Sequence, residues 1–249
     1  MAIRTAWCGA CVGLLAANPA AAQLVDTVLV GSSVLRGASL PLGMETVESS
    51  SISEGNWTRI SSTSRTISRG KEGDVDTYVI ATTHVSSSGN TTTATIIVRA
   101  ADFALIHHKV KARSDSTAMS ANAHHLTGWV VLSGQPARLI DQTIDRPVFP
   151  IEGQMPWLLP LLPYQDRYAV AIPRFSPWFG GEVWGSVEVL GTEAIEYGGT
   201  VLECWKVDTG ELGPPGYRSI RWIDKSSRRI IRTVLRGLPS QPEYWTLAQ

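Results

Sequence analysis

The feature that most constrains the fold of this chain is an alternation of apolar and polar residues with a period of two. In residues 183–190, small and apolar residues at odd positions alternate with larger or polar residues at even positions. Residues 200–208 repeat the alternation, with Val201 and Trp205 on one face. Successive side chains of a strand point to opposite faces, so this period indicates half-buried β-strands. Helical periodicity is scarce in the rest of the chain.

Clusters of turn-forming residues separate the predicted strands. Residues 76–85 and 91–99 are rich in β-branched residues, and Ser, Gly and Asn fill the positions between them. Residues 218–224 and 228–236 form a second pair, joined by a Lys-Ser-Ser turn. Strands joined by short turns pair antiparallel, and a flat open sheet of this length would expose its edges. The predicted fold class is all-β with minor α content: a curved antiparallel sheet forming a half-barrel or open barrel, with a short irregular or helical cover segment.

Two polar segments are predicted to lie outside this sheet. The serine-rich residues 48–54 are expected to form a turn or loop, because their composition is typical of solvated surface. The tail that follows Leu238 carries two prolines and is expected to be loosely held.

The first 22 residues have the pattern of a secretory signal peptide. Arg4 precedes a short apolar run over residues 6–17, and the alanines ending at Ala22 offer a cleavage site. The run is too short for a membrane-spanning helix. We therefore expect cleavage after Ala22 and a periplasmic or secreted protein, in which residues 23–249 form a single β-rich half-barrel domain without a transmembrane segment.

The charge balance and the cysteine content narrow the class of protein further. Without Arg4, 21 basic and 22 acidic residues remain, so there is no overall positive field to hold nucleic acid. Cys8 and Cys11 lie in the signal, which leaves Cys204 alone. Stability must then come from the core and the sheet, and we expect Cys204 to be a buried, unreactive thiol.

Residues 149–164 break the strand pattern. This segment combines large aliphatic residues with Pro156, Pro160 and Pro163, which exclude a long regular helix. It could be a plug that closes an open end of the sheet, or a mobile lid over an apolar cavity. Eight tryptophans follow the signal, and they could fill a core or line such a cavity. The candidate cavity residues are Trp129, Trp157, Leu158, Leu161, Leu162, Trp178 and Trp184.

The sequence selects no catalytic residue, metal site or cofactor. There is no G-x-S-x-G motif, and no pair stands out among the scattered glutamates. His107-His108 and His124-His125 would each place one ring on either face of a strand, which does not make a metal site. An enzyme is therefore disfavoured.

Five segments of the second half resemble exported bacterial proteins of unknown function. The segments are Trp157-Leu-Leu-Pro-Leu-Leu-Pro163, Tyr168-Ala-Val-Ala-Ile-Pro173, Val187-Glu-Val-Leu-Gly191, Cys204-Trp-Lys-Val-Asp208 and Trp222-Ile-Asp-Lys-Ser-Ser-Arg-Arg-Ile-Ile-Arg232. These proteins are similar to the half-barrel of periplasmic lipoprotein carriers and lipoprotein-binding regulators. The resemblance covers about residues 135–238 and implies a curved sheet around a concave apolar face. This chain departs from the pattern by placing prolines where a covering helix is expected.

The resemblance and the leucine-tryptophan segment together predict an exported envelope protein that binds a lipid, a lipoprotein acyl chain or another apolar ligand in the concave face. Burial of each methylene group contributes about 0.8 kcal/mol, so one acyl chain can bind without directed polar contacts. One alternative is a structural or interaction module of the envelope with a filled core and an envelope protein as partner. The other is a secreted hydrolase.

Overall fold

A computed structural model describes residues 26–35, 38–53, 56–150, 155–210, 218–236 and 244–248. The predicted signal peptide, residues 1–22, lies outside this part of the chain. Two short 3₁₀ turns, η1 (Ser33–Leu35) and η2 (Leu159–Leu161), are the helical elements of the described residues. Neither they nor any other described helix has the length and apolarity needed to cross a membrane.

The strands join into one sheet. They are β1 (Asp26–Thr27), β2 (Gly43–Ser53), β3 (Asn56–Glu72), β4 (Val75–Ser86), β5 (Thr91–Arg99), β6 (Leu105–Lys111), β7 (Ser116–Asn122), β8 (His125–Val131), β9 (Arg138–Thr143), β10 (Phe149–Pro150), β11 (Ala169–Ser176), β12 (Gly181–Tyr197), β13 (Thr200–Asp208), β14 (Arg218–Asp224), β15 (Ile230–Arg236) and β16 (Tyr244–Ala248). Their order in the sheet is β1-β11-β12-β13-β14-β15-β16-β2-β3-β4-β5-β6-β7-β8-β9, and β10 also pairs with β11.

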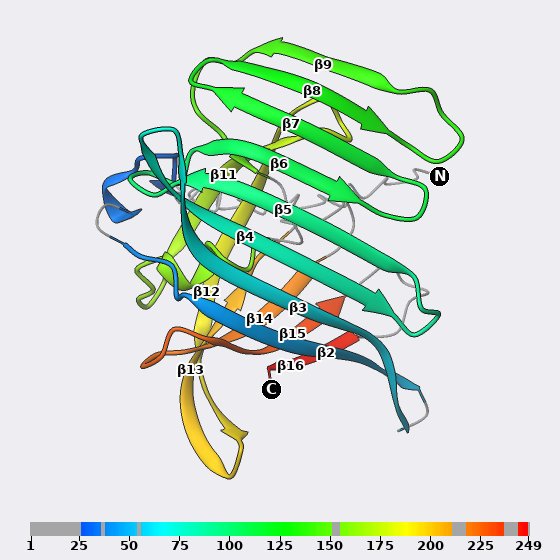
Figure 1. The fold of residues 1–249 in the computed structure, drawn as a ribbon. Helices are drawn as coiled ribbons and strands as arrows, with labels where there is room; N and C mark the ends of the chain where they lie inside the picture. The colour runs from blue at the N-terminus through cyan, green and yellow to red at the C-terminus, as the bar shows by residue number, and fades with distance from the viewer. Residues whose placement is uncertain are drawn as a thin grey trace, which may run out of the picture.

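The predicted fold class is confirmed. All pairings between described strands are antiparallel except those of β1 and β10 with β11. The pairings begin at β1 and end at β9, and no pairing of described strands joins these two ends, so the sheet stays open. It curves back on itself, with β2–β9 running across the front of Figure 1 and β11–β15 behind them.

The two segments that were expected to lie outside the sheet are strands, so these predictions are wrong. The serine-rich residues belong to β2, and the tail contributes β16, which pairs with β2 through Ser49 opposite Thr246 and Ser51 opposite Tyr244. Neither strand has the apolar alternation that reveals a strand in sequence. On one side each strand pairs with its neighbour along the chain, β3 or β15, and on the other side β2 and β16 pair with each other across almost 200 residues, which leaves no local signal.

The main core lies between the two halves of the curved sheet. Tyr78, Ile80 and Ile96 point inward from β4 and β5 and are fully buried, as is Ile172 of β11 on the opposite side. Residues 155–164 pack into the same cluster. A smaller cluster on β12–β15 includes Trp222, Ile220 and Cys204. As a result β14 is buried on both faces, with Arg218 its exposed residue.

An aromatic stack ties the irregular segment to the front of the sheet. The ring of Phe103 lies parallel to that of Tyr78, with centroids 5.9 Å apart, and 6.4 Å from the ring of Trp157. All three side chains are buried. Such pairs add to the burial energy of the rings themselves, so this stack fixes residues 155–164 against β4.

We predict that Trp157→Ala lowers the free energy of unfolding by about 3–5 kcal/mol, because it leaves a cavity at a site that is 1% exposed. The matched control is Trp129→Ala, since Trp129 is 37% exposed on β8 and its removal should cost about 1 kcal/mol. Urea unfolding followed by circular dichroism measures both values. Equal losses in the two variants would contradict the placement of Trp157 in the core.

Candidate functional site

Residues 155–164 form a series of tight turns instead of a helix. Backbone hydrogen bonds run from Leu158 N to Met155 O (2.9 Å), from Leu161 N to Leu158 O (3.0 Å) and from Leu162 N to Leu159 O (3.2 Å). Pro160 sits in the first turn of η2, where a missing N–H group costs nothing. The prolines therefore allow single turns only, which is why no covering helix forms.

These turns fill the concave face of the sheet. Trp157, Leu158 and Leu162 are buried in the main core, and Leu161 is half-buried against it. We call residues 155–164 the plug. The structure thus brings four of the seven predicted cavity residues together as packed core side chains.

The other three predicted cavity residues lie apart from the plug. Trp129 stands opposite Leu139 on β8 and β9 and is partly exposed. Trp178 is half-buried in the turn between β11 and β12, where its carbonyl oxygen accepts a hydrogen bond from Arg138 (3.1 Å). Trp184 is 50% exposed on β12, with the Arg146 guanidinium 5.6 Å from its ring centroid.

Polar contacts hold the C-terminal end of the plug. The Tyr164 hydroxyl donates to the Leu159 carbonyl oxygen at 2.9 Å, and burial raises the pKa of this phenol, so it stays a neutral donor. Arg228 Nη1 donates to the Leu162 carbonyl oxygen at 3.3 Å. Nearby on β14, burial and the charge of Arg65 lower the pKa of Arg221 to about 9.

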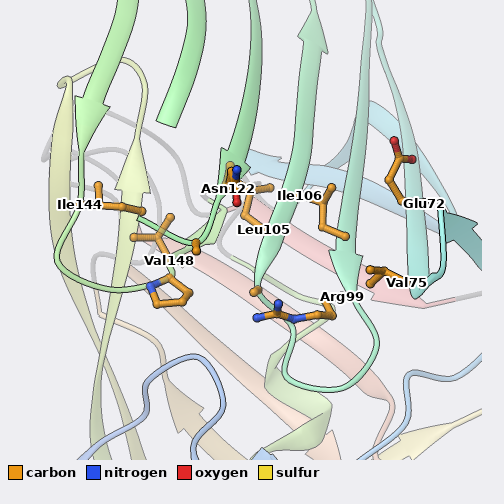
Figure 2. Close-up of a pocket in the computed structure, with 12 residues that line it drawn as sticks. Glu72, Val75, Arg99, Leu105, Ile106, Asn122, Ile144 and Val148 are labelled. Carbon is orange, nitrogen blue, oxygen red and sulfur yellow. The ribbon is translucent and has the colours of Figure 1, made fainter. Parts of the chain in front are cut away.

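A second candidate site is a pocket at one end of the front strands, which we call the strand-end pocket (Figure 2). Its volume is about 170 Å³. Figure 2 shows Glu72 and Val75 on one side, and Ile144 and Val148 on the other. The lining residues are Glu72, Val75, Arg99, Ala104, Leu105, Ile106, Ala121, Asn122, Ala123, Ile144, Pro147 and Val148. Most of them are apolar.

Charged side chains lie at the rim of this pocket. Arg99 donates two hydrogen bonds to Asp102, from Nε at 2.7 Å and from Nη2 at 2.6 Å, and this bonding raises its pKa. Glu72 Oε1 lies 3.3 Å from His107 Nε2. The sequence does not predict this pocket, because its lining residues come from the ends of different strands. Only the order of these strands in the sheet brings the residues together.

The adjacent histidines of β6 point to opposite faces, as predicted. His107 is partly exposed, and its Nδ1 lies 2.9 Å from Ser120 Oγ. His108 is 1% exposed between Ile96 and Met119, and neither of its ring nitrogens has a hydrogen-bond partner among the described residues. Burial lowers its pKa to about 4. Among the described residues, no group of three or more His, Cys, Asp and Glu side chains could hold a metal ion.

A family model matches most of the chain. Residues 49–236 match the family model described as "Protein of unknown function (DUF3108)". The match covers three quarters of the chain, and the protein belongs to this uncharacterised family.

Comparisons with curated proteins and with solved structures do not assign a function. A search of curated proteins found no match. Among solved structures, a DUF1329 family protein from Desulfovibrio piger ATCC 29098 is 11% identical, with a TM-score of 0.25 over 83% of this chain and 82% of that one. At that TM-score the likeness carries no argument about fold or function.

We predict that His108 makes the protein acid-labile. Its pKa is about 6.5 in the unfolded chain and about 4 in the folded protein, so between these values the unfolded state binds more protons. Stability is fully present above pH 6.5 and falls by about 3 kcal/mol as the pH drops through 4. His108→Leu should remove this part of the pH dependence in urea unfolding, whereas His124→Gln, at an exposed turn, should not. Parallel curves for wild type and His108→Leu would refute the assignment.

Cys204 should not react with thiol reagents in the folded protein. Its side chain is fully buried, and burial together with Asp224 and Glu193 raises its pKa to about 11. We expect no reaction with Ellman's reagent at pH 8 until urea unfolds the chain. Stoichiometric labelling in native buffer, at a rate independent of urea, would contradict this burial.

Proposed function

We propose that the protein is an exported, non-catalytic interaction module of the cell envelope, which binds its partner on the outside of a filled core. The observation that carries the proposal is the plug. A carrier of acyl chains needs empty volume in the concave face, and here Trp157, Leu158 and Leu162 occupy it. The single-domain organisation and the signal peptide, with its cut after Ala22, are part of the same proposal.

Energetics favour a plug that stays in place. Exposure of a fully buried large apolar side chain costs roughly 1.5–3 kcal/mol, and the plug would expose several at once. A ligand that entered the concave face would have to replace these contacts in full. Partner binding on the outer surface carries no such cost.

A hydrolase gains no support from the described interior. His108 faces the concave core, but it lacks the hydrogen-bond partner that would orient a general base.

A second candidate function, the lipid or lipoprotein carrier, is favoured by one observation. The backbone hydrogen bonds given above for the plug are local turn bonds, and one arginine side chain, Arg228, tethers its C-terminal end. Segments without ladder hydrogen bonds open more readily than strands. In this candidate an acyl chain would displace the plug and contact Trp157, Leu158, Leu161 and Leu162, while Trp129, Trp178 and Trp184 would serve the rim.

One experiment separates the two candidates. Native mass spectrometry of the protein, purified from its own envelope without detergent, is combined with tryptophan fluorescence during titration with palmitate and lysophosphatidylcholine. The interaction module predicts the mass of the polypeptide alone and an unchanged spectrum. The carrier predicts one bound lipid and a spectral change that is clearly smaller in Trp157→Phe, because this variant removes the tryptophan of the plug while retaining an aromatic ring. Lipid uptake with that dependence would overturn our proposal.

A further inference from the structure

The strand-end pocket has the size of a single ring or a short alkyl group. An apolar cavity of about 150 Å³ is large enough to take up benzene. At about 170 Å³, this pocket lies just above that size. Leu105, Ala121 and Val148 supply apolar walls that would exclude water around such a group.

Three departures from regular backbone meet at the pocket. In the pairing of β5 with β6, Ile97 stands opposite His107 and Val98 opposite Leu105, so Ile106 is an extra, bulged residue. Bulges redirect side chains and are common beside functional sites. Ala123 (φ 43°) lines the pocket and Phe103 (φ 63°) precedes the lining residue Ala104, and both adopt the left-handed conformation that favours glycine. Such strained residues cluster where a site is shaped for a ligand.

The charges around the pocket leave the mouth negative. Arg99 is held by Asp102 in a two-bond ion pair, which neutralises both groups. Arg146, which precedes the lining residue Pro147, is likewise held by Glu182 at 2.9 Å. Glu72 Oε1 lies 3.3 Å from His107 Nε2, and no Lys or Arg among the described residues forms an ion pair with this carboxylate.

The turn between β3 and β4 adds to this negative charge. Lys71 lies 3.8 Å from Asp76, which balances one acid of the turn. Asp74 stands exposed between Glu72 and Val75, both of which line the pocket. The turn beside Glu72 therefore brings a second carboxylate, that of Asp74, to this side of the pocket.

We propose that the strand-end pocket binds a small organic amine, with its ring or alkyl group against the apolar walls and its ammonium group beside Glu72. The Asn122 side chain, at the end of β7, offers a neutral polar contact in the same pocket. An anion of the same shape would meet the carboxylates of the mouth and be rejected. None of the plug residues lines this pocket, so the proposal does not rest on the function proposed above.

The test is a titration of the ¹⁵N-labelled protein with three probes of one shape, which are benzylamine, benzyl alcohol and benzoate. We expect saturable shifts at the amides of the lining residues through the millimolar range, strongest for benzylamine and weakest for benzoate. Absence of saturable binding, or benzoate binding as tightly as benzylamine, would overturn the proposal. So would saturation at a site elsewhere on the sheet.

Variants test the two parts of the site. Ala121→Leu fills the pocket and should abolish binding of all three probes, whereas Ala81→Leu, a matched change at an exposed position of β4, should not. Glu72→Gln should weaken benzylamine by about two- to five-fold, as expected for a partly exposed charge pair, and leave benzyl alcohol unchanged. Glu196→Gln, an exposed residue of β12, is its control. An unchanged preference for the amine in Glu72→Gln would refute the role of that carboxylate, and retained binding in Ala121→Leu would refute the pocket.

Discussion

An open antiparallel sheet that curves presents an apolar concave face, and that face must be covered before the sheet can persist in water. In this protein the cover comes from residues 155–164, whose tryptophan and leucine side chains lie against strands of both halves of the sheet. The aromatic stack of Tyr78, Phe103 and Trp157 joins this segment to β4 and to the loop before β6. The two candidate functions differ in this contact. In the interaction module the plug stays in place, and in the carrier a ligand displaces it.

The interior also contains groups that water would normally solvate. His108 is buried between Ile96 and Met119, and this burial favours its neutral ring by lowering its pKa. Tyr164 and Arg228 supply polar contacts to the carbonyl groups of the plug, where a strand ladder would otherwise satisfy them. Tyr164 and Arg228 thus hold the plug in place, whereas the charged groups at the rim of the strand-end pocket remain accessible to solvent.

Local sequence patterns correctly predicted individual strands and the turns between them. The alternation in residues 183–190 lies within β12, and the turn predicted at residues 86–90 joins β4 to β5 over residues 87–90. The pairing of β2 with β16 escaped prediction because it joins distant, polar segments by backbone contacts. Among the candidate residues, Trp157 and the leucines at 158, 161 and 162 could be grouped correctly because they are close together in the sequence. The positions of the three remaining tryptophans depend on the order of the strands in the sheet, and no short sequence pattern contains that order.

The position of β16 in the sheet affects how the sheet assembles. This strand comes from residues 244–248, yet it lies in the interior of the strand order, between β15 and β2. The two halves of the sheet are therefore joined by a strand whose partner β2 lies almost 200 residues away in the chain, and long-range pairing of this kind forms slowly. A chain without residues 244–248 would hold two unjoined sheet edges, at β15 and at β2, and exposed edges of this kind can pair with other chains. Fusions placed directly after residue 248 should disturb the middle of the sheet and not a dispensable tail.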